Sequence, residues 1–261
     1  ELRQNHPTNI IFLLSTTSSK TAFEGCPVIR IDSYNSTQTF KQISLHTDTE
    51  YTLIYTKTSP LELGYKALNR MASHLISNQC SMVYSDYNEL KNGKLTKHPV
   101  IDYQLGSVRD DFDFGSLLMF HTPSLKAATI QLKENYKYGA LFAILLFISQ
   151  ISSIRHIKEY LYTEREDDLR LSGEKQFDYV NPRNREVQIE MEAVFTDHLR
   201  AIGAYLPPRE QRVNFRQVSF DTEASVIIPV RNRVKNIKNA IDSVLSQETN
   251  FPYNVIVVDN H

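Results

Sequence analysis

Short apolar runs along the chain alternate with longer segments in which apolar residues recur at a helical period. The runs of strand character span residues 9–14, 28–31, 51–55 and 81–84. Between the last two runs, apolar residues stand at positions 68, 71, 72, 75 and 76, which predicts one apolar stripe along a helix. This alternation predicts an α/β fold built on a mixed, mostly parallel sheet flanked by helices.

Residues 59–62, Ser-Pro-Leu-Glu, predict the start of that helix. Serine is a favoured N-cap, proline suits the first helical position, and glutamate three residues after the cap closes a capping box. Another helix is expected over residues 138–149. Its most apolar stretch, 140–148, is far shorter than the roughly 20 residues that cross a bilayer, so we expect a buried helix and no membrane span.

The last third of the chain predicts a helix, a linker and an incomplete βαβ unit. After a charged stretch over 164–185, the helix would carry apolar residues at 191, 194, 195, 199 and 202 and end at Gly203. Residues 207–221 have little periodicity. An apolar strand over 225–229, an amphipathic helix over 237–245 and a second strand over 254–258 then follow. We therefore predict a domain over 1–206, a linker over 207–221 and the start of a second domain over 222–261.

Composition restricts the partners and the compartment. Lys and Arg total 29 against 30 for Asp and Glu, so no excess of positive charge favours nucleic acid or an anionic membrane. Cys26 and Cys80 lack the spacing of metal ligands, and the first residues show no signal-peptide pattern. We expect a cytoplasmic protein, either free or at the cytoplasmic face of the membrane, with both cysteines buried.

Polar residues stand at the carboxyl ends of both strands in the βαβ unit. Residues 229–233 follow the first strand, and Asp259 ends the second. Ligands of open α/β sheets bind at such ends, where a carboxylate accepts hydrogen bonds from a base or ribose and arginine faces phosphate. Any βαβ unit places polar residues there, however, so spacing alone leaves a purely structural role open.

Three blocks of this unit resemble the opening of the family 2 glycosyltransferases. They read SVIIPVRNR, NIKNAIDSVLSQ and YNVIVVDNH, in the family's order and spacing. The resemblance implies the GT-A fold and a nucleotide-sugar donor whose nucleotide is bound by Pro229, Asn232 and Asp259. It also implies inverting transfer of the sugar to a glycan or another hydroxyl acceptor.

The same resemblance implies a divalent metal, Mg²⁺ or Mn²⁺, held by an Asp-x-Asp motif, and a carboxylate base. Both would lie beyond His261, so we expect the chain to be a fragment with little transferase activity of its own. No catalytic residue is assigned within it.

The first 206 residues resemble a shortened, degenerate copy of the same fold. Residues 28–33 parallel the strand that ends in Asp259, which makes Asp32 its counterpart and a candidate for binding the nucleotide-sugar. Where the family places its metal carboxylates, residues 55–57 read Tyr-Thr-Lys. No metal site is therefore expected there, although Lys57 could pair with a phosphate.

Several other polar residues of this copy are each open to two interpretations. Asp86 either binds the nucleotide-sugar or caps the turn after its strand. The acids at 110, 111 and 113 have either a chemical role, as general bases or metal ligands, or no such role, as part of a solvated loop. The solvated loop is the commoner case for such a run of charges. His156 lies either near the end of the GT-A core or inside it as a structural residue. The helix over 138–149 lacks the Glu-Asp pair that the family carries.

Two hypotheses for function follow. In the first, the protein is a glycosyltransferase whose chemistry falls to the second domain. In the second, the first domain is a non-catalytic GT-A-like module that binds glycan or acts as a scaffold.

Overall fold

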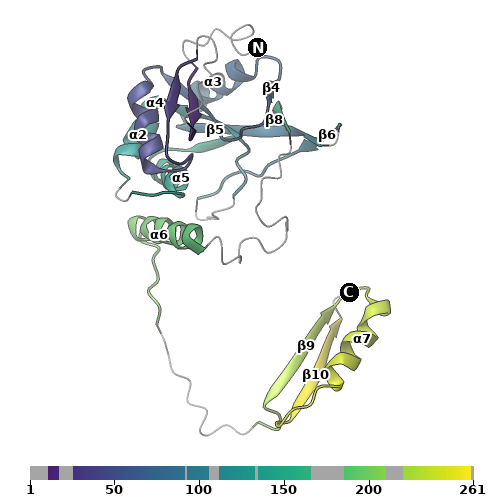
Figure 1. Ribbon diagram of the computed structural model, residues 1–261. Coiled ribbons are helices and arrows are strands. Elements are labelled where there is room, and N and C mark those ends of the chain that lie inside the picture. Colours follow the sequence, from purple (N-terminus) through teal and green to yellow (C-terminus); the bar gives the residue numbers. More distant parts are fainter. Residues whose placement is uncertain are drawn as a thin grey trace. The chain divides into compact units, whose positions relative to one another are not determined.

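The computed structural model describes residues 11–17, 26–91, 93–105, 112–132, 135–165, 185–209 and 220–259 (Figure 1). The chain divides into two compact units, Glu1–Leu206 and Pro207–His261, here called the N-terminal unit and the C-terminal unit. Residues 210–219 of the predicted linker, and 166–184 of the charged stretch, lie outside the described residues.

A six-stranded mixed sheet forms the centre of the N-terminal unit. The strand order is β3-β7-β5-β8-β4, and β6 pairs with β5. The strands are β3 (Tyr51–Tyr55), β4 (Leu61–Leu63), β5 (Met82–Lys91), β6 (Lys94–His98), β7 (Leu117–His121) and β8 (Ile154–Arg165). A separate parallel pair consists of β1 (Leu13–Ser15) and β2 (Val28–Arg30).

The mixed sheet flanked by helices is confirmed, and it is consistent with a GT-A-like fold. Its strand directions nevertheless differ from the expected excess of parallel pairs, because β5 and β8 are parallel while the other pairs of this sheet are antiparallel. One cause is local, since β6 returns from β5 as a hairpin through Gly93. The other is topological, since β7 lies between two strands that run in the opposite direction.

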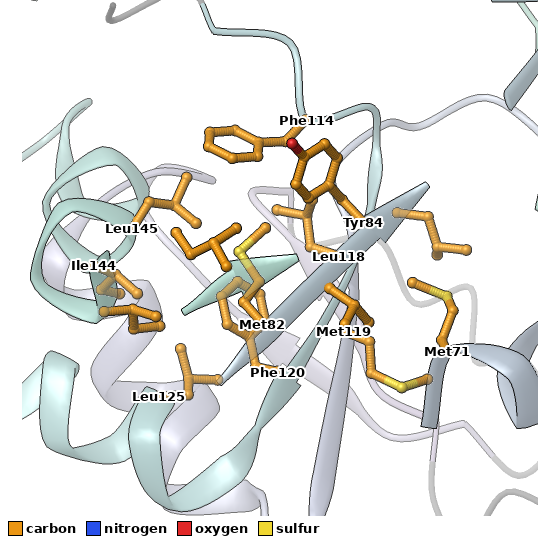
Figure 2. Close-up of a cluster of buried hydrophobic side chains, with 14 of the residues drawn as sticks. Met71, Met82, Tyr84, Phe114, Leu118, Met119, Phe120, Leu125, Ile144 and Leu145 are labelled. Carbon is orange, nitrogen blue, oxygen red and sulfur yellow. The ribbon is translucent and has the colours of Figure 1, made fainter. Parts of the chain in front are cut away.

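Helices cover both faces of this sheet. The helices of this unit are α2 (Thr37–His46), α3 (Ala67–Asn78), α4 (Thr122–Ile130), α5 (Ala140–Ile151) and α6 (Arg185–Ala201). Helices α2, α4 and α5 lie together in Figure 1, and α6 packs on α5. Alternate side chains of β7 face opposite ways in Figure 2, with Met119 towards Met71 of α3 and Phe120 towards Leu125 of α4.

Helix α5 is the buried helix that its apolar run predicts, with Ile144 and Ile148 fully buried. Among the described residues, no helix combines the length and apolar character needed to cross a membrane. Of the two cysteines, Cys80 is buried as expected, whereas Cys26 is only half-buried.

The predicted start of the helix after residue 59 is wrong. Leu61–Leu63 forms strand β4, which pairs with residues 162–164 of β8, and α3 begins only at Ala67. The next residue, Gly64, continues this attachment by donating its N–H to the carbonyl of Leu161 at 2.8 Å. Pairing with a distant strand therefore overrides the local capping signal, since a capping box contributes only about 1 kcal/mol.

The C-terminal unit is the βαβ unit that the sequence predicts. Strand β9 (Ala224–Val230), helix α7 (Val234–Leu245) and strand β10 (Tyr253–Asp259) follow one another, and the two strands are parallel. Asp259 pairs with Val230, so both strands end at the same level.

Gly115, just before β7, and Gly93, between β5 and β6, both have positive φ. Gly93 therefore serves as a control for a test of the packing at Gly115. A Cβ on Gly115 (φ +70°) would lie 2.3 Å from Tyr162 Oη, whereas Gly93 (φ +76°) has no atom within 4 Å. Gly93→Ala should lower the free energy of unfolding by about 1–2 kcal/mol, from backbone strain alone. Gly115→Ala should lose a further 1–3 kcal/mol or so from overpacking. Urea unfolding measures both, and equal losses would contradict the packing at Gly115.

Candidate functional site

The predicted residues of the C-terminal unit lie at one edge of its two-stranded sheet. Pro229 pairs with Val258 and Val230 with Asp259, so the turn after β9 and the end of β10 are neighbours. Asn232 lies in this turn with φ +53°, a left-handed conformation that asparagine tolerates better than most residues. The structure thus brings Pro229, Asn232 and Asp259 to the same edge.

The turn leads directly into the N-terminus of α7 and forms a small hollow. A cavity of about 320 Å³ is lined by residues 232–236, including the exposed cations Arg233 and Lys235. The first turn of α7 contains no acidic side chain, and within the described unit the N-cap Arg233 makes no side-chain capping bond. The N-terminal end of the helix and the two cations together suit an anionic group such as phosphate.

In the N-terminal unit, Asp32 supports the turn that starts α2. Its Oδ1 accepts hydrogen bonds from Ser36 Oγ at 2.7 Å and from the N–H of Ser33 at 2.8 Å. Ser36 is in turn the N-cap of α2 and accepts from the N–H of Thr39 at 3.2 Å. The bond from Ser36 is the main cause that holds the pKa of Asp32 below its usual value.

An ion pair with a buried carboxylate forms at residues 55–57, the segment where the resemblance would place metal ligands. Lys57 follows β3, and its Nζ contacts Oε1 of Glu164, whose side chain is only 1% exposed. The second oxygen, Oε2, accepts from Ser116 Oγ, and the N–H of Ser116 donates to Tyr162 Oη at 2.8 Å. Lys57 is therefore matched by a carboxylate of its own chain, which disfavours the predicted pairing with phosphate.

Asp86 is buried in β5 and holds a neighbouring segment. Its Oδ1 accepts from the N–H of Val100 at 2.9 Å and lies 2.8 Å from Nε2 of His156. The other ring nitrogen of His156 lies 2.7 Å from Oδ1 of Asp102, whose Oδ2 contacts Lys158 Nζ at 2.9 Å. Both ring nitrogens of His156 therefore face carboxylate oxygens, so this histidine links β5 and β8 to the segment that contains Asp102.

Tyr84, two residues before Asp86 in β5, binds the same segment. Its hydroxyl donates to the carbonyl of Ile101 and accepts from the N–H of Tyr103, both at 2.7 Å. Its ring stacks on His156 at 5.1 Å, and burial raises its pKa. Residues 100–103 are thus fixed over Asp86, whose observed contacts are structural.

The remaining acids do not assemble a metal site. Asp113 accepts from the N–H of Gly115 at 2.8 Å and pairs with His98, while residues 110 and 111 lie outside the described residues. Across the parts of the chain that the structure describes, no group of three His, Cys, Asp or Glu side chains could hold a metal ion. These residues therefore do not fit the divalent metal implied by the resemblance.

Several of these contacts escaped sequence analysis. Glu164 and Asp102 were not singled out, because their partners stand 107 and 54 residues away in the chain. The polar pattern of β8 gave no signal that Glu164 faces inward. The burial of Glu164 becomes evident only in the tertiary structure, where the end of β8 meets residues next to β3 and β7.

Comparison with known families supports the resemblance of the C-terminal unit. The model of Glycosyl transferase family 2 matches residues 225–261, which span β9, α7 and β10. The search of curated proteins found no match. The match supports a glycosyltransferase at the level of the family, and it rests on the unit in which Pro229, Asn232 and Asp259 share an edge.

The ion pair of Lys57 should matter more to stability than a surface pair. Lys57→Met leaves Glu164 buried without its cation, and we expect a loss of about 2 kcal/mol; fully buried pairs lose about 3–5 kcal/mol, and Lys57 is partly exposed. The control is Arg70→Met, which breaks the exposed pair of Arg70 with Glu159 and should cost at most about 1 kcal/mol. Denaturant unfolding at neutral pH compares them. Equal small losses would show that Glu164 does not need Lys57.

The role of Asp32 predicts a pH dependence. Because its pKa is lowered in the folded state, its contribution to stability is present above the ordinary value of 3.8 and is lost as the pH falls through the folded pKa. Asp32→Asn should therefore be less stable than wild type near neutral pH, and the difference should shrink below the ordinary value. A difference that stays constant down to low pH would contradict this role.

Proposed function

We propose that this chain is part of a nucleotide-sugar-dependent glycosyltransferase and that its C-terminal unit contributes the nucleotide site. The observation that carries the proposal is the coincidence of two findings in one segment. The family model matches residues 225–261, and within that segment Pro229, Asn232 and Asp259 meet at the carboxyl edge of the sheet.

The chemistry of this edge suits a nucleoside diphosphate. The carboxylate of Asp259 can accept hydrogen bonds from the base or ribose, and the exposed Arg233 and Lys235 lie where a diphosphate would need positive charge. In the proposed reaction an acceptor hydroxyl of a glycan or another molecule forms the new glycosidic bond with inversion. The bond to the nucleoside diphosphate breaks, and a carboxylate base takes the hydroxyl proton. No residue of this chain is assigned as that base.

We propose a non-catalytic role for the N-terminal unit, as a scaffold or a glycan-binding module. Three of its polar candidates are engaged with other groups of the unit: Lys57 with Glu164, Asp86 with His156, and Asp32 with Ser36. The divalent metal implied by the resemblance, Mg²⁺ or Mn²⁺, stays part of the proposal, and none of these residues is assigned to hold it. A catalytic N-terminal unit would need these internal pairs to open.

Calorimetry with uridine and guanosine diphosphates, with and without Mn²⁺, tests the proposal on the full 261-residue chain. Asp259→Asn removes a charged acceptor and should weaken the binding of the preferred diphosphate about tenfold or more. Asp32→Asn, in the N-terminal unit, should leave the affinity unchanged.

A further control is Asp242→Asn, since Asp242 lies on α7 and pairs with Lys238 rather than standing at the strand ends. It should bind like wild type. The proposal fails if no diphosphate binds, or if Asp32→Asn weakens binding while Asp259→Asn does not.

A further inference from the structure

Helix α6 is attached to the N-terminal unit with little apolar burial. It packs on α5, and of its 17 residues only Val194 and His198 are buried. Helix α5 is shorter and buries more than twice as many side chains. Because the hydrophobic contribution to docking scales with the apolar area removed from water, the attachment of α6 depends strongly on its polar contacts.

Glu190 of α6 supplies the most extensive of these contacts. Its Oε1 accepts hydrogen bonds from the N–H groups of Tyr138 and Gly139, both at 2.6 Å, and its Oε2 accepts from the N–H of Lys137 at 3.0 Å. These three residues precede Ala140, the first residue of α5, at the end of the helix where the dipole favours negative charge. Hydrogen bonds to an ionised acceptor are stronger than neutral ones, so one side chain anchors the helix.

Gly139 allows α6 to approach α5 this closely. A Cβ at this position would lie 3.1 Å from Val194 Cγ2 and 3.3 Å from Glu190 Oε1, closer than most Cβ contacts. The φ of Gly139 is −100°, a negative value that other residues also adopt. The advantage of glycine here therefore comes from the contact with α6 and not from the backbone conformation.

The start of α5 is also bound to the turn that carries Asp32. Ser33 Oγ donates to the carbonyl of Lys137 at 2.9 Å. The N–H of Thr37 donates to the carbonyl of Tyr136 at 2.8 Å, and the N–H of Tyr136 donates to Thr37 Oγ1 at 2.9 Å. Continuous hydrogen bonds thus connect the segment that α6 contacts with the turn after β2.

We propose that α6 is a releasable strap, that the carboxylate of Glu190 anchors it, and that its docking orders the turn that carries Asp32. In the closed state the carboxylate holds residues 137–139 and, through them, the turn. In the open state α6 leaves α5 while the six-stranded sheet stays folded, as in other sub-global openings. The strap does not depend on the glycosyltransferase assignment.

Hydrogen exchange of backbone amides in low urea, on the full 261-residue chain, tests whether the strap opens. The amides of α6 and of residues 137–139 should exchange through an opening that requires less free energy, and depends less on urea, than the opening of β5 and β8. The same free energy and the same urea dependence for all of them would overturn the proposal, because α6 would then leave only on global unfolding.

Glu190→Gln identifies the anchor, since it keeps the shape of the side chain and removes its charge. Exchange in α6 and at residues 137–139 should become about tenfold faster, the difference between a charged and a neutral acceptor. The matched control is Glu192→Gln, which makes the same change at an exposed position of α6 and should leave exchange unchanged. No effect of Glu190→Gln, or an equal effect of Glu192→Gln, would overturn the proposal.

Gly139→Ala tests the same contact from the side of α5. The added methyl group should displace α6 and speed the exchange of its amides about fivefold or more. Unchanged exchange would contradict the close approach of the strap. Should Glu190→Gln not fold, this variant and the wild-type measurement still decide.

Amide ¹H–¹⁵N signals of Ser33 and Thr37 report the coupling to the Asp32 turn. Both signals should shift in Glu190→Gln, because the segment that binds them loses its anchor, and neither should shift in Glu192→Gln. Shifts confined to α6 and residues 137–139 would overturn the proposed coupling.

Discussion

The N-terminal unit is organised around one buried carboxylate. Glu164 is 1% exposed, and an ionised group at that depth is tolerated only when it is paired and hydrogen-bonded. Lys57 after β3 and Ser116 before β7 meet this requirement together, so three strands are locked at one edge of the sheet. The same contacts engage Lys57, the residue of this unit for which a pairing with phosphate was predicted. A stability requirement thus accounts for the position of Lys57.

The polar candidates of the two units differ in their exposure. In the N-terminal unit, the side chains of Asp86 and His156 lie within strands, are buried, and bind residues 100–103 to the sheet. In the C-terminal unit, Asn232 and Asp259 are exposed at the edge, beside the cations that line the hollow at α7. The family match falls on this second edge. Structural pairing on one side and exposed polar groups on the other support the proposed division between a scaffold and a nucleotide-binding unit.

The period of apolar residues predicts helices and strands correctly wherever the local pattern and the tertiary context agree. It predicts β3, the buried helix α5, and the complete order of β9, α7 and β10. It fails at residues 61–63, where a capping signal is overridden by pairing with β8. It also gives no access to Glu164 or Asp102, whose partners stand 48 to 107 residues away in the chain. Such contacts depend on how the strands and helices assemble, which no local spacing encodes.

The location of a bound nucleotide tests the central claim most directly. Amide ¹H–¹⁵N spectra of the full chain, recorded as uridine diphosphate is added, report which edge responds. The account predicts shifts confined to residues 229–236 and the end of β10, with the signals of Lys57, Asp86 and Glu164 unchanged. Shifts centred on those three residues would contradict it, because they would show that the internal pairs open to admit the nucleotide.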